Sequence, residues 1–271
     1  MATPLIEEWA NATENELKQI EGVCLDIDDT LSTHGKLTAQ AFEALWRLKK
    51  AGLFVVPITG RPAGWCDHIA RFWPVDAVVG ENGAFTFFLQ DGKLKRYETP
   101  CEPSAEESKK KLIALKGVIA VHFPGVQFAS DQNYREFDLA IDFCEDVPAW
   151  TQEEMDRLVA LCEQSGAHAK VSSIHVNTWF GDYDKRKGFE SFLSFQNKNE
   201  GKPFPAWERW LFIGDSPNDE PLFKSFKYSV GVSNLKKFLN RFKNPPRWLT
   251  IGESGEGFVE MADKMISIRK K

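Results

Sequence analysis

The feature that most constrains the fold is an alternation of short apolar runs with helix-like segments in the N-terminal part of the chain. Three apolar runs have the length of buried strands, at residues 22–27, 53–58 and 76–79. Between them lie a segment at 38–50, with apolar residues at helical spacing, and a second helical pattern that begins at Pro62. This strand–helix–strand–helix–strand order predicts a right-handed parallel sheet of the Rossmann-like α/β class.

The pattern changes in the middle of the chain. Strand-like stretches at 85–88 and 137–143 accompany helix patterns at 104–115 and from Thr151 to Gly166, where Thr151 and Glu154 form a capping box. The α/β pattern then returns, with a helix from Lys187 and strands at 210–213, 228–232 and 248–251. We therefore predict an α/β core made of residues 1–84 and 185–271, and an inserted α+β cap domain at 85–184.

Charge, hydropathy and cysteine content narrow the functional classes. The chain has 271 residues and a net charge of −5, without the extended basic stripe that a nucleic-acid backbone requires. It contains no signal-peptide pattern and no run of about 18 apolar residues, so we expect no membrane partner. Its five cysteines include no C-x-x-C pair, which argues against a disulfide framework and a zinc site. These features predict a cytoplasmic protein and leave its oligomeric state open.

Carboxylates follow two of the predicted strands. Asp26 and Asp28 come directly after the first strand, and residues two apart on an extended chain point the same way. Asp215 and Asp219 follow the strand at 210–213. Ligands of open α/β sheets bind at the carboxyl ends of the strands, so these side chains are expected to converge there. A cluster of carboxylate oxygens is the kind of site that Mg²⁺ prefers.

Groups that suit phosphate stand at two further element ends. The strand at 53–58 ends in Thr59-Gly60-Arg61, which offers a hydroxyl, backbone N–H groups and a guanidinium. Lys187-Gly188 is predicted to open a helix, whose N-terminus favours an anion.

Taken in order, these motifs resemble the four motifs of the haloacid dehalogenase superfamily of hydrolases. The quoted set is Asp26-x-Asp28-x-Thr30, Thr59-Gly60-Arg61, Lys187-Gly188 and Gly214-Asp215-x-x-Asn218-Asp219. The long insertion and the segment Gly80-Glu81-Asn82-Gly83-Ala84 are similar to the C2-capped branch, which includes Cof-type and sucrose-phosphate-phosphatase-like members. Residues 255–259 resemble the glycine-containing loop before the last helix of that branch.

The resemblance implies a role for each matching residue. Asp26 is the expected nucleophile and Asp28 the general acid and base. Mg²⁺ is expected on Asp26, the backbone carbonyl of Asp28, Asp215 and Asp219, with Asp219 either a direct ligand or a residue that orients one. Phosphate is expected on Thr59, Gly60 and Lys187, and further substrate contacts are expected from Arg61, Asn82 and Asn218.

The cap offers one candidate surface. Ser173, His175, Asn177 and Trp179 alternate along a probable strand, so they share one face. His175 and Asn177 are therefore candidates for contact with the substrate, and the alternative is an ordinary sheet surface.

The predicted function is Mg²⁺-dependent hydrolysis of a small phosphorylated metabolite, with a sugar phosphate favoured, through an aspartyl-phosphate intermediate. Two alternatives remain: a phosphomutase on the same fold, and a non-catalytic module that binds phosphate esters. The complete set of carboxylates favours an enzyme.

Overall fold

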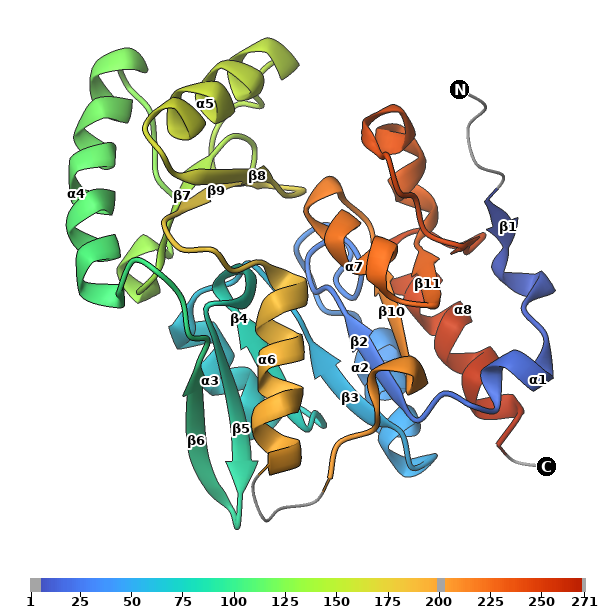
Figure 1. Cartoon of the computed structure of the whole chain (residues 1–271). Helices are drawn as coiled ribbons and strands as arrows, with labels where there is room; N and C mark the ends of the chain where they lie inside the picture. Colours follow the sequence, from blue (N-terminus) through green and yellow to red (C-terminus); the bar gives the residue numbers. More distant parts are fainter. Residues whose placement is uncertain (1–5, 199–202, 270–271) are drawn as a thin grey trace.

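The computed structural model describes residues 6–198 and 203–269. Its centre is a parallel sheet with the strand order β1–β12–β11–β10–β2–β3 (Figure 1). In chain order, these strands are β1 (Glu7–Glu8), β2 (Gly22–Leu25), β3 (Phe54–Pro57), β10 (Trp210–Gly214), β11 (Tyr228–Gly231) and β12 (Trp248–Leu249). The predicted class, a parallel-sheet core with an additional domain, is confirmed.

Helices cover both faces of this sheet because its strands are apolar on both sides. Val23 and Leu25 of β2 share one apolar cluster with α2 and α8, whereas Cys24 shares another with α6 and α7. Successive strand residues point to opposite faces, so a strand covered on both sides is a continuous apolar run. The core helices are α1 (Glu14–Leu17), α2 (Ala39–Lys50), α3 (Ala63–Phe72), α6 (Lys185–Lys198), α7 (Glu220–Ser225) and α8 (Ser254–Ser267).

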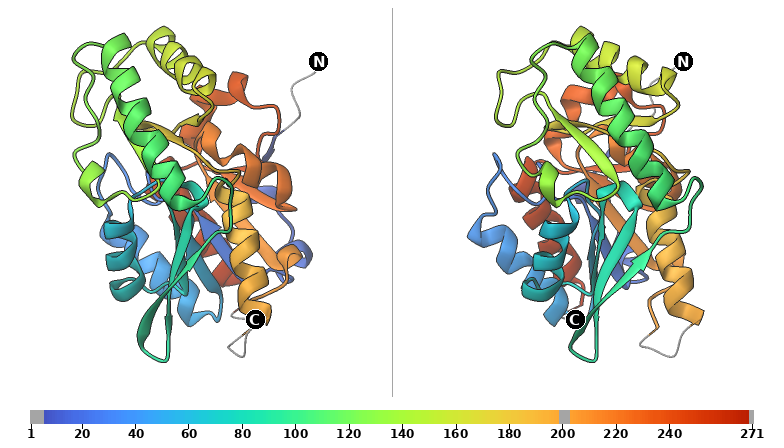
Figure 2. Two further views of the ribbon diagram at one scale, coloured as in Figure 1. Left: turned by 60° about the vertical axis from the view of Figure 1, so that its left-hand side comes forward. Right: turned by 90° about the vertical axis from the view of Figure 1, so that its left-hand side faces the viewer.

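A hairpin extends the core beside β3 and marks a difference from the predicted domain boundary. Strand β4 (Ala77–Gly80) bridges to the end of β3, and it pairs antiparallel with β5 (Phe85–Gln90), which pairs with β6 (Lys93–Glu98). Residues 85–98 were predicted to begin the cap. Instead, apolar side chains of β5 pack on α3 and α6, and the hairpin points away from the cap (Figure 2).

The cap is a second antiparallel sheet with two helices on its outer face (Figures 1 and 2). The strand order is β7–β9–β8, and apolar residues of each strand pack against α4 and α5. In each strand, the residues that alternate with these apolar residues face the core. The elements are α4 (Ala105–His122), β7 (Asp138–Asp142), α5 (Gln152–Gln164), β8 (His168–Val171) and β9 (His175–Trp179).

A buried carboxylate attaches the cap to the core. Glu81 follows β4, and its side chain accepts N–H groups from Ala63 at the start of α3 and from Phe137 just before β7. Burial, and then the nearby Asp138, raise the pKa of Glu81 to about 8.

Several boundaries differ from the sequence prediction. Residues 255–259, expected as a loop, lie inside α8, and the helix expected from Lys187 begins two residues earlier, at Lys185. The Thr151 cap is present, since its hydroxyl accepts the N–H of Glu154. The remaining short helical turns are η1 (Trp9–Asn11), η2 (Glu81–Gly83), η3 (Gln132–Tyr134), η4 (Trp207–Arg209), η5 (Pro217–Asp219) and η6 (Ser233–Arg241).

Two further expectations concern the cysteines and membrane-spanning segments. All five cysteines are free. Within residues 6–198 and 203–269, we find no helix with the length and apolar character needed to span a bilayer.

Candidate active site

Three buried carboxylates meet at the carboxyl edge of the parallel sheet. Strands β2 and β10 are neighbours in register, with Leu25 beside Ile213, so Asp26 and Asp215 leave the sheet side by side. Oxygens of Asp26, Asp215 and Asp219 lie within 4.8 Å of one another. Gly214 makes room for this arrangement, because a Cβ there would lie 2.4 Å from Oδ2 of Asp219.

The lysine at these carboxylates is Lys185, and the prediction of Lys187 is corrected. Nζ of Lys185 donates to Asp26 Oδ1 and to Asp219 Oδ1, each at 2.7 Å. The Lys187 side chain is 48% exposed, and its ammonium binds Asp182 instead. The reason is helical geometry: two residues along α6 turn a side chain by roughly 200°, onto the opposite face.

Gly188 also has a different role from the one predicted. A Cβ at this position would lie 2.4 Å from the carbonyl oxygen of Gly83. The glycine therefore permits close packing of α6 on the turn after β4, and it does not lie at the start of the helix.

Burial governs the electrostatics of the cluster. It raises the pKa of Asp26 to about 8; Lys185 opposes this effect, and Asp219 and Asp28 add to it. Burial and the neighbouring Asp26 raise the pKa of Asp215 as well. For Lys185, burial acts to lower the pKa, but the carboxylates of Asp219 and Asp26 outweigh it and raise it. A cluster in which one ammonium faces three carboxylates favours binding of a further cation.

The hydrogen bonds of each carboxylate indicate which oxygens fit a metal ion. Oδ1 of Asp215 accepts the hydroxyl of Thr30, whereas its buried Oδ2 has no partner among the described residues. Both oxygens of Asp219 are engaged, Oδ1 by Lys185 and Oδ2 by the N–H groups of Asp215 and Ser216. The donor set therefore fits a hard cation on Asp26 and Asp215, with Asp219 fixing the loop and the lysine.

Arg61 joins the second aspartate of the first motif to the cap. Its Nε and Nη2 donate to the carboxylate of Asp28 at 2.8–3.1 Å, and Nη2 also lies 2.8 Å from Oε1 of Glu145 in the cap. The adjacent His175 and the charge of Arg61 hold the pKa of Glu145 at about 2, against the opposing effect of burial. Arg61 is thus saturated by carboxylates, and in this structure it faces Asp28 rather than an open phosphate site.

The cap residues His175 and Asn177 lie over the carboxylates. Both line a cavity of only about 10 Å³ whose floor includes Asp26 and Asp28, so the cap closes tightly over the cluster. Nε2 of His175 lies 2.9 Å from Glu145 Oε2. Asn177 donates from Nδ2 to Asp138 Oδ2 at 3.0 Å.

The other predicted contacts lie around the same edge. Thr59 is fully buried, and its Oγ1 accepts the N–H of Arg61. Gly60 borders the cavity between the cap and the carboxylates, as does Asn218. Asn82 donates from Nδ2 to Asp138 Oδ2 instead, at 3.5 Å, and borders a neighbouring cavity.

Sequence reasoning missed four charged residues near the site. These are Lys185, Arg135, Asp138 and Glu145. The sequence could have indicated Lys185, because this residue is the first basic residue of the Lys185-Arg186-Lys187 run and follows the loop after a strand. Arg135 and Glu145 lie in irregular segments of the insertion, and Asp138 lies in the predicted strand at 137–143, whose pattern does not indicate that its polar face meets the core.

Comparisons with known proteins agree with this geometry. Residues 23–125 match the family described as haloacid dehalogenase-like hydrolase. A phosphoglycolate phosphatase from Nitrosopumilus maritimus is 27% identical over 249 residues, which are 90% of this chain and 95% of that protein.

Two solved structures are similar over nearly their full length. A HAD/COF-like hydrolase from Plasmodium vivax has a TM-score of 0.69 at 16% identity, covering 94% of this chain and 99% of that one. The sucrose-phosphatase of Synechocystis, solved with sucrose and phosphate, has a TM-score of 0.63 at 16% identity, covering 91% and 98%.

These likenesses support the predicted relation to the haloacid dehalogenase superfamily, and the solved structures share the capped fold of this chain. For this haloacid dehalogenase-like chain, the predicted fold is confirmed, and the likenesses support the predicted class of enzyme, a phosphatase.

Proposed function

We propose that this protein is a Mg²⁺-dependent phosphatase that hydrolyses a small phosphorylated metabolite through a phosphoryl group carried on Asp26. The observation that supports it most is the buried ammonium of Lys185, held between Asp26 and Asp219 beneath the closed cap. A fixed cation beside an anionic nucleophile is suited to a phosphate ester, whose charge otherwise repels a carboxylate.

In the first step, a carboxylate oxygen of Asp26 attacks phosphorus. The new bond joins this oxygen to phosphorus, the bond from phosphorus to the substrate's ester oxygen breaks, and the ester oxygen leaves with a proton from Asp28. Lys185 and the buried hydroxyl of Thr59 bind the phosphoryl oxygens during transfer.

In the second step, water attacks the phosphorus of the aspartyl phosphate. Asp28 takes a proton from this water, the bond between phosphorus and Asp26 breaks, and inorganic phosphate leaves. Arg61 donates from Nε and Nη2 to the carboxyl group of Asp28 and so fixes its orientation.

The residues that fit Mg²⁺ are Asp26 and Asp215, with the backbone carbonyl of Asp28 as the third ligand implied by the family resemblance. When bound, the ion neutralises charge on the phosphate and on the carboxylates. Asp219 keeps the loop and Lys185 in place.

A sugar phosphate remains the favoured substrate class. The cap face over the site is polar, with His175, Asn177 and Ser173 bordering the cavity, and such groups suit hydroxyl-bearing leaving groups. The relative from Nitrosopumilus is named for phosphoglycolate, and the Synechocystis neighbour for sucrose phosphate, so both kinds of leaving group belong in the test.

The test is phosphate release from a panel of sugar phosphates, phosphoglycolate and 4-nitrophenyl phosphate, with Mg²⁺ and with EDTA. We expect Mg²⁺-dependent release of inorganic phosphate. Isomerised sugar phosphate without free phosphate would identify a mutase, and binding without either product would identify a non-catalytic module.

Mg²⁺ should stabilise the fold more at alkaline than at acid pH. The pKa of Asp26 is raised to about 8 in the metal-free fold. The stability that depends on protonation of Asp26 is therefore fully present below the pKa of this residue in the unfolded chain, and it is lost as the pH rises through about 8. Binding of Mg²⁺ restores this stability. At a Mg²⁺ concentration of about 100 times the Kd, binding adds ~2.7 kcal/mol to the free energy of unfolding, or roughly 5–10 °C to the Tm. Thermal melts at pH 6 and pH 8.5 measure this difference. Asp215→Asn should abolish the shift; a shift equal at both pH values would contradict the assignment.

His175→Ala and Asn177→Ala should change substrate choice more than chemistry. Each removes a polar group that borders the cavity above Asp28. A lost neutral hydrogen bond to substrate costs about 0.5–1.5 kcal/mol, a factor of about 2–13 in kcat/KM. The best substrate of the panel should show this loss, and 4-nitrophenyl phosphate should show less of it. Equal losses on both substrates would assign the two residues to folding or to chemistry.

A further inference from the structure

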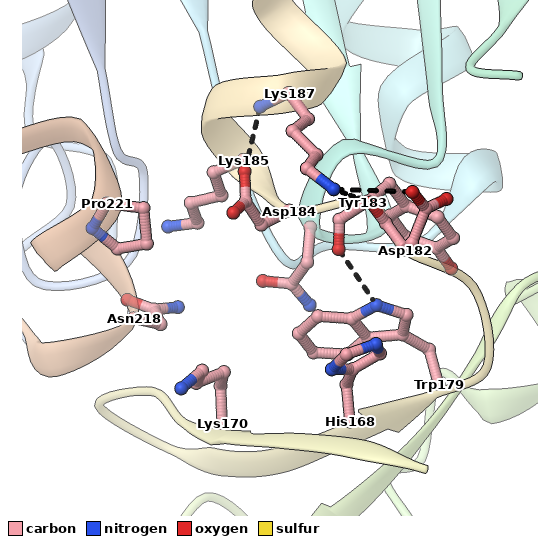
Figure 3. Close-up of a pocket in the computed structure, with 11 residues that line it drawn as sticks. His168, Lys170, Trp179, Asp182, Tyr183, Asp184, Lys185, Lys187, Asn218 and Pro221 are labelled. Atoms are coloured by element: carbon pink, nitrogen blue, oxygen red, sulfur yellow. Dashed lines mark hydrogen bonds and ion pairs between the residues drawn. The ribbon is translucent and has the colours of Figure 1, made fainter. Parts of the chain in front are cut away.

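A second cavity opens beside the catalytic carboxylates, between the core and the cap. Its volume is about 310 Å³, and Figure 3 shows Lys185 and Asn218 of the core on one side and Lys170, His168 and Trp179 of the cap on the other. The cavity adjoins the catalytic site, because Lys185, which lines it, binds Asp26, and Asn218 borders both spaces. A substrate group attached to the reacting phosphate can therefore extend into it.

Lys170 is the cap residue best placed to meet such a group. In β8, Ala169 and Val171 pack into the apolar interior of the cap, so His168 and Lys170 face the core. Lys170 stands beside Asn177 of β9 in the sheet register. Its ammonium has no ion-pair partner among the described residues, whereas Lys187 across the cavity is neutralised by Asp182.

The positive character continues outward from Lys170. A shallower groove of about 470 Å³ shares Lys170 with the first cavity and is also lined by Arg186, Lys224 and Lys243. Arg186 pairs with Glu190, and the carboxylate of Glu220 in the groove accepts backbone N–H groups. Lys170, Lys224 and Lys243 have no ion-pair partner within residues 6–198 and 203–269, so this concave strip attracts anions although the net charge of the chain is −5.

We propose that Lys170 is a specificity-determining residue that binds a second anionic group on the leaving group of the substrate. The inference rests on the proposed phosphatase function and narrows its substrate class to phosphate monoesters that carry a further carboxylate or phosphate. The reacting phosphate lies at Asp26 and Lys185, and the second anion lies at Lys170, with Lys224 and Lys243 attracting the substrate from outside.

The kinetic test compares three substrates that differ in the second group. Glucose 6-phosphate has none, 3-phosphoglycerate has a carboxylate and fructose 1,6-bisphosphate has a second phosphate. We expect the wild-type protein to prefer either 3-phosphoglycerate or fructose 1,6-bisphosphate to glucose 6-phosphate. The preferred compound identifies the second group as a carboxylate or a phosphate. For this preferred substrate, the ratio of kcat/KM to the value for glucose 6-phosphate should fall about tenfold in the Lys170→Gln variant. The ratio should fall further in the Lys170→Glu variant. The control Lys109→Gln, an exposed lysine on α4, should keep the wild-type ratio.

A binding measurement keeps this inference separable from the proposed function. Calorimetric titration of the Asp26→Asn protein with the same three compounds needs no turnover. The affinity ratio should again fall about tenfold when Lys170→Gln is added. Ratios unchanged by both Lys170 substitutions, or a wild-type preference for glucose 6-phosphate, would overturn the inference even if phosphate is released. Absence of phosphate release with an intact Lys170 effect on binding would overturn only the proposed function.

Discussion

Asp26→Asn is expected to abolish phosphate release while the protein remains folded. The amide is nearly isosteric with the carboxylate but is a far poorer nucleophile, and loss of an essential nucleophile costs on the order of 10⁶ in rate. Steady-state assays with the best substrate of the panel and with 4-nitrophenyl phosphate measure the loss.

The folding control for this variant follows from the buried cluster. Asparagine removes one of three carboxylates that crowd together, so the metal-free variant should melt no lower than wild type at pH 8.5. A well-folded Asp26→Asn protein with near-normal turnover would remove Asp26 from the mechanism.

Lys185→Met is expected to lower kcat/KM by about 10²–10³, whereas Lys187→Met should stay close to wild type. Loss of a single fixed donor to a developing anion has costs of this size. Lys185 touches two of the cluster carboxylates, and Lys187 touches Asp182 at the surface. Assays of both variants with one substrate measure the difference.

Lys187→Met serves as the control for Lys185→Met, and Lys185→Arg is a second control. Lys185→Arg should recover part of the activity, because it restores the charge without the compact shape of an ammonium. If Lys187→Met loses as much activity as Lys185→Met, the assignment of Lys185 as the only lysine of α6 that serves the phosphate is wrong.

The parts of the fold that the sequence predicted well are those with a periodic or local signal. The apolar run at β2 and the helix capped by Thr151 are examples, since the Thr151 hydroxyl accepts the N–H of Glu154 as the capping box predicts. The meeting of Asp26 and Asp215 followed from a simple rule, that parallel strands end at one edge. The structure places both as that rule requires.

Two misplacements have physical causes. Lys185 and Lys187 both stand near the start of one helix, and only the exact first residue of α6 decides which side chain faces Asp26. Strand β5 looked like part of the cap sheet because a strand pattern does not specify its partner. In the structure it pairs with β4 across the turn at 81–84, and its Phe85 and Phe87 pack against α3 of the core.

The cap contacts lay beyond sequence reasoning for a further reason. Arg61 binds Asp28 and Glu145 together, and Glu145 lies far along the chain in an irregular loop after β7. Such a contact depends on how the cap sits on the core, and no local pattern encodes it.

The most direct test of the central claim is a pre-steady-state measurement with Asp28→Asn and 4-nitrophenyl phosphate. Nitrophenolate leaves without help from an acid, so the first step should proceed, whereas the second step lacks the base that activates water. The mechanism predicts a stoichiometric burst of nitrophenolate, slow turnover afterwards, and a phosphoryl group on the peptide that contains Asp26. Turnover without a burst, or a phosphoryl group on any other residue, would contradict it.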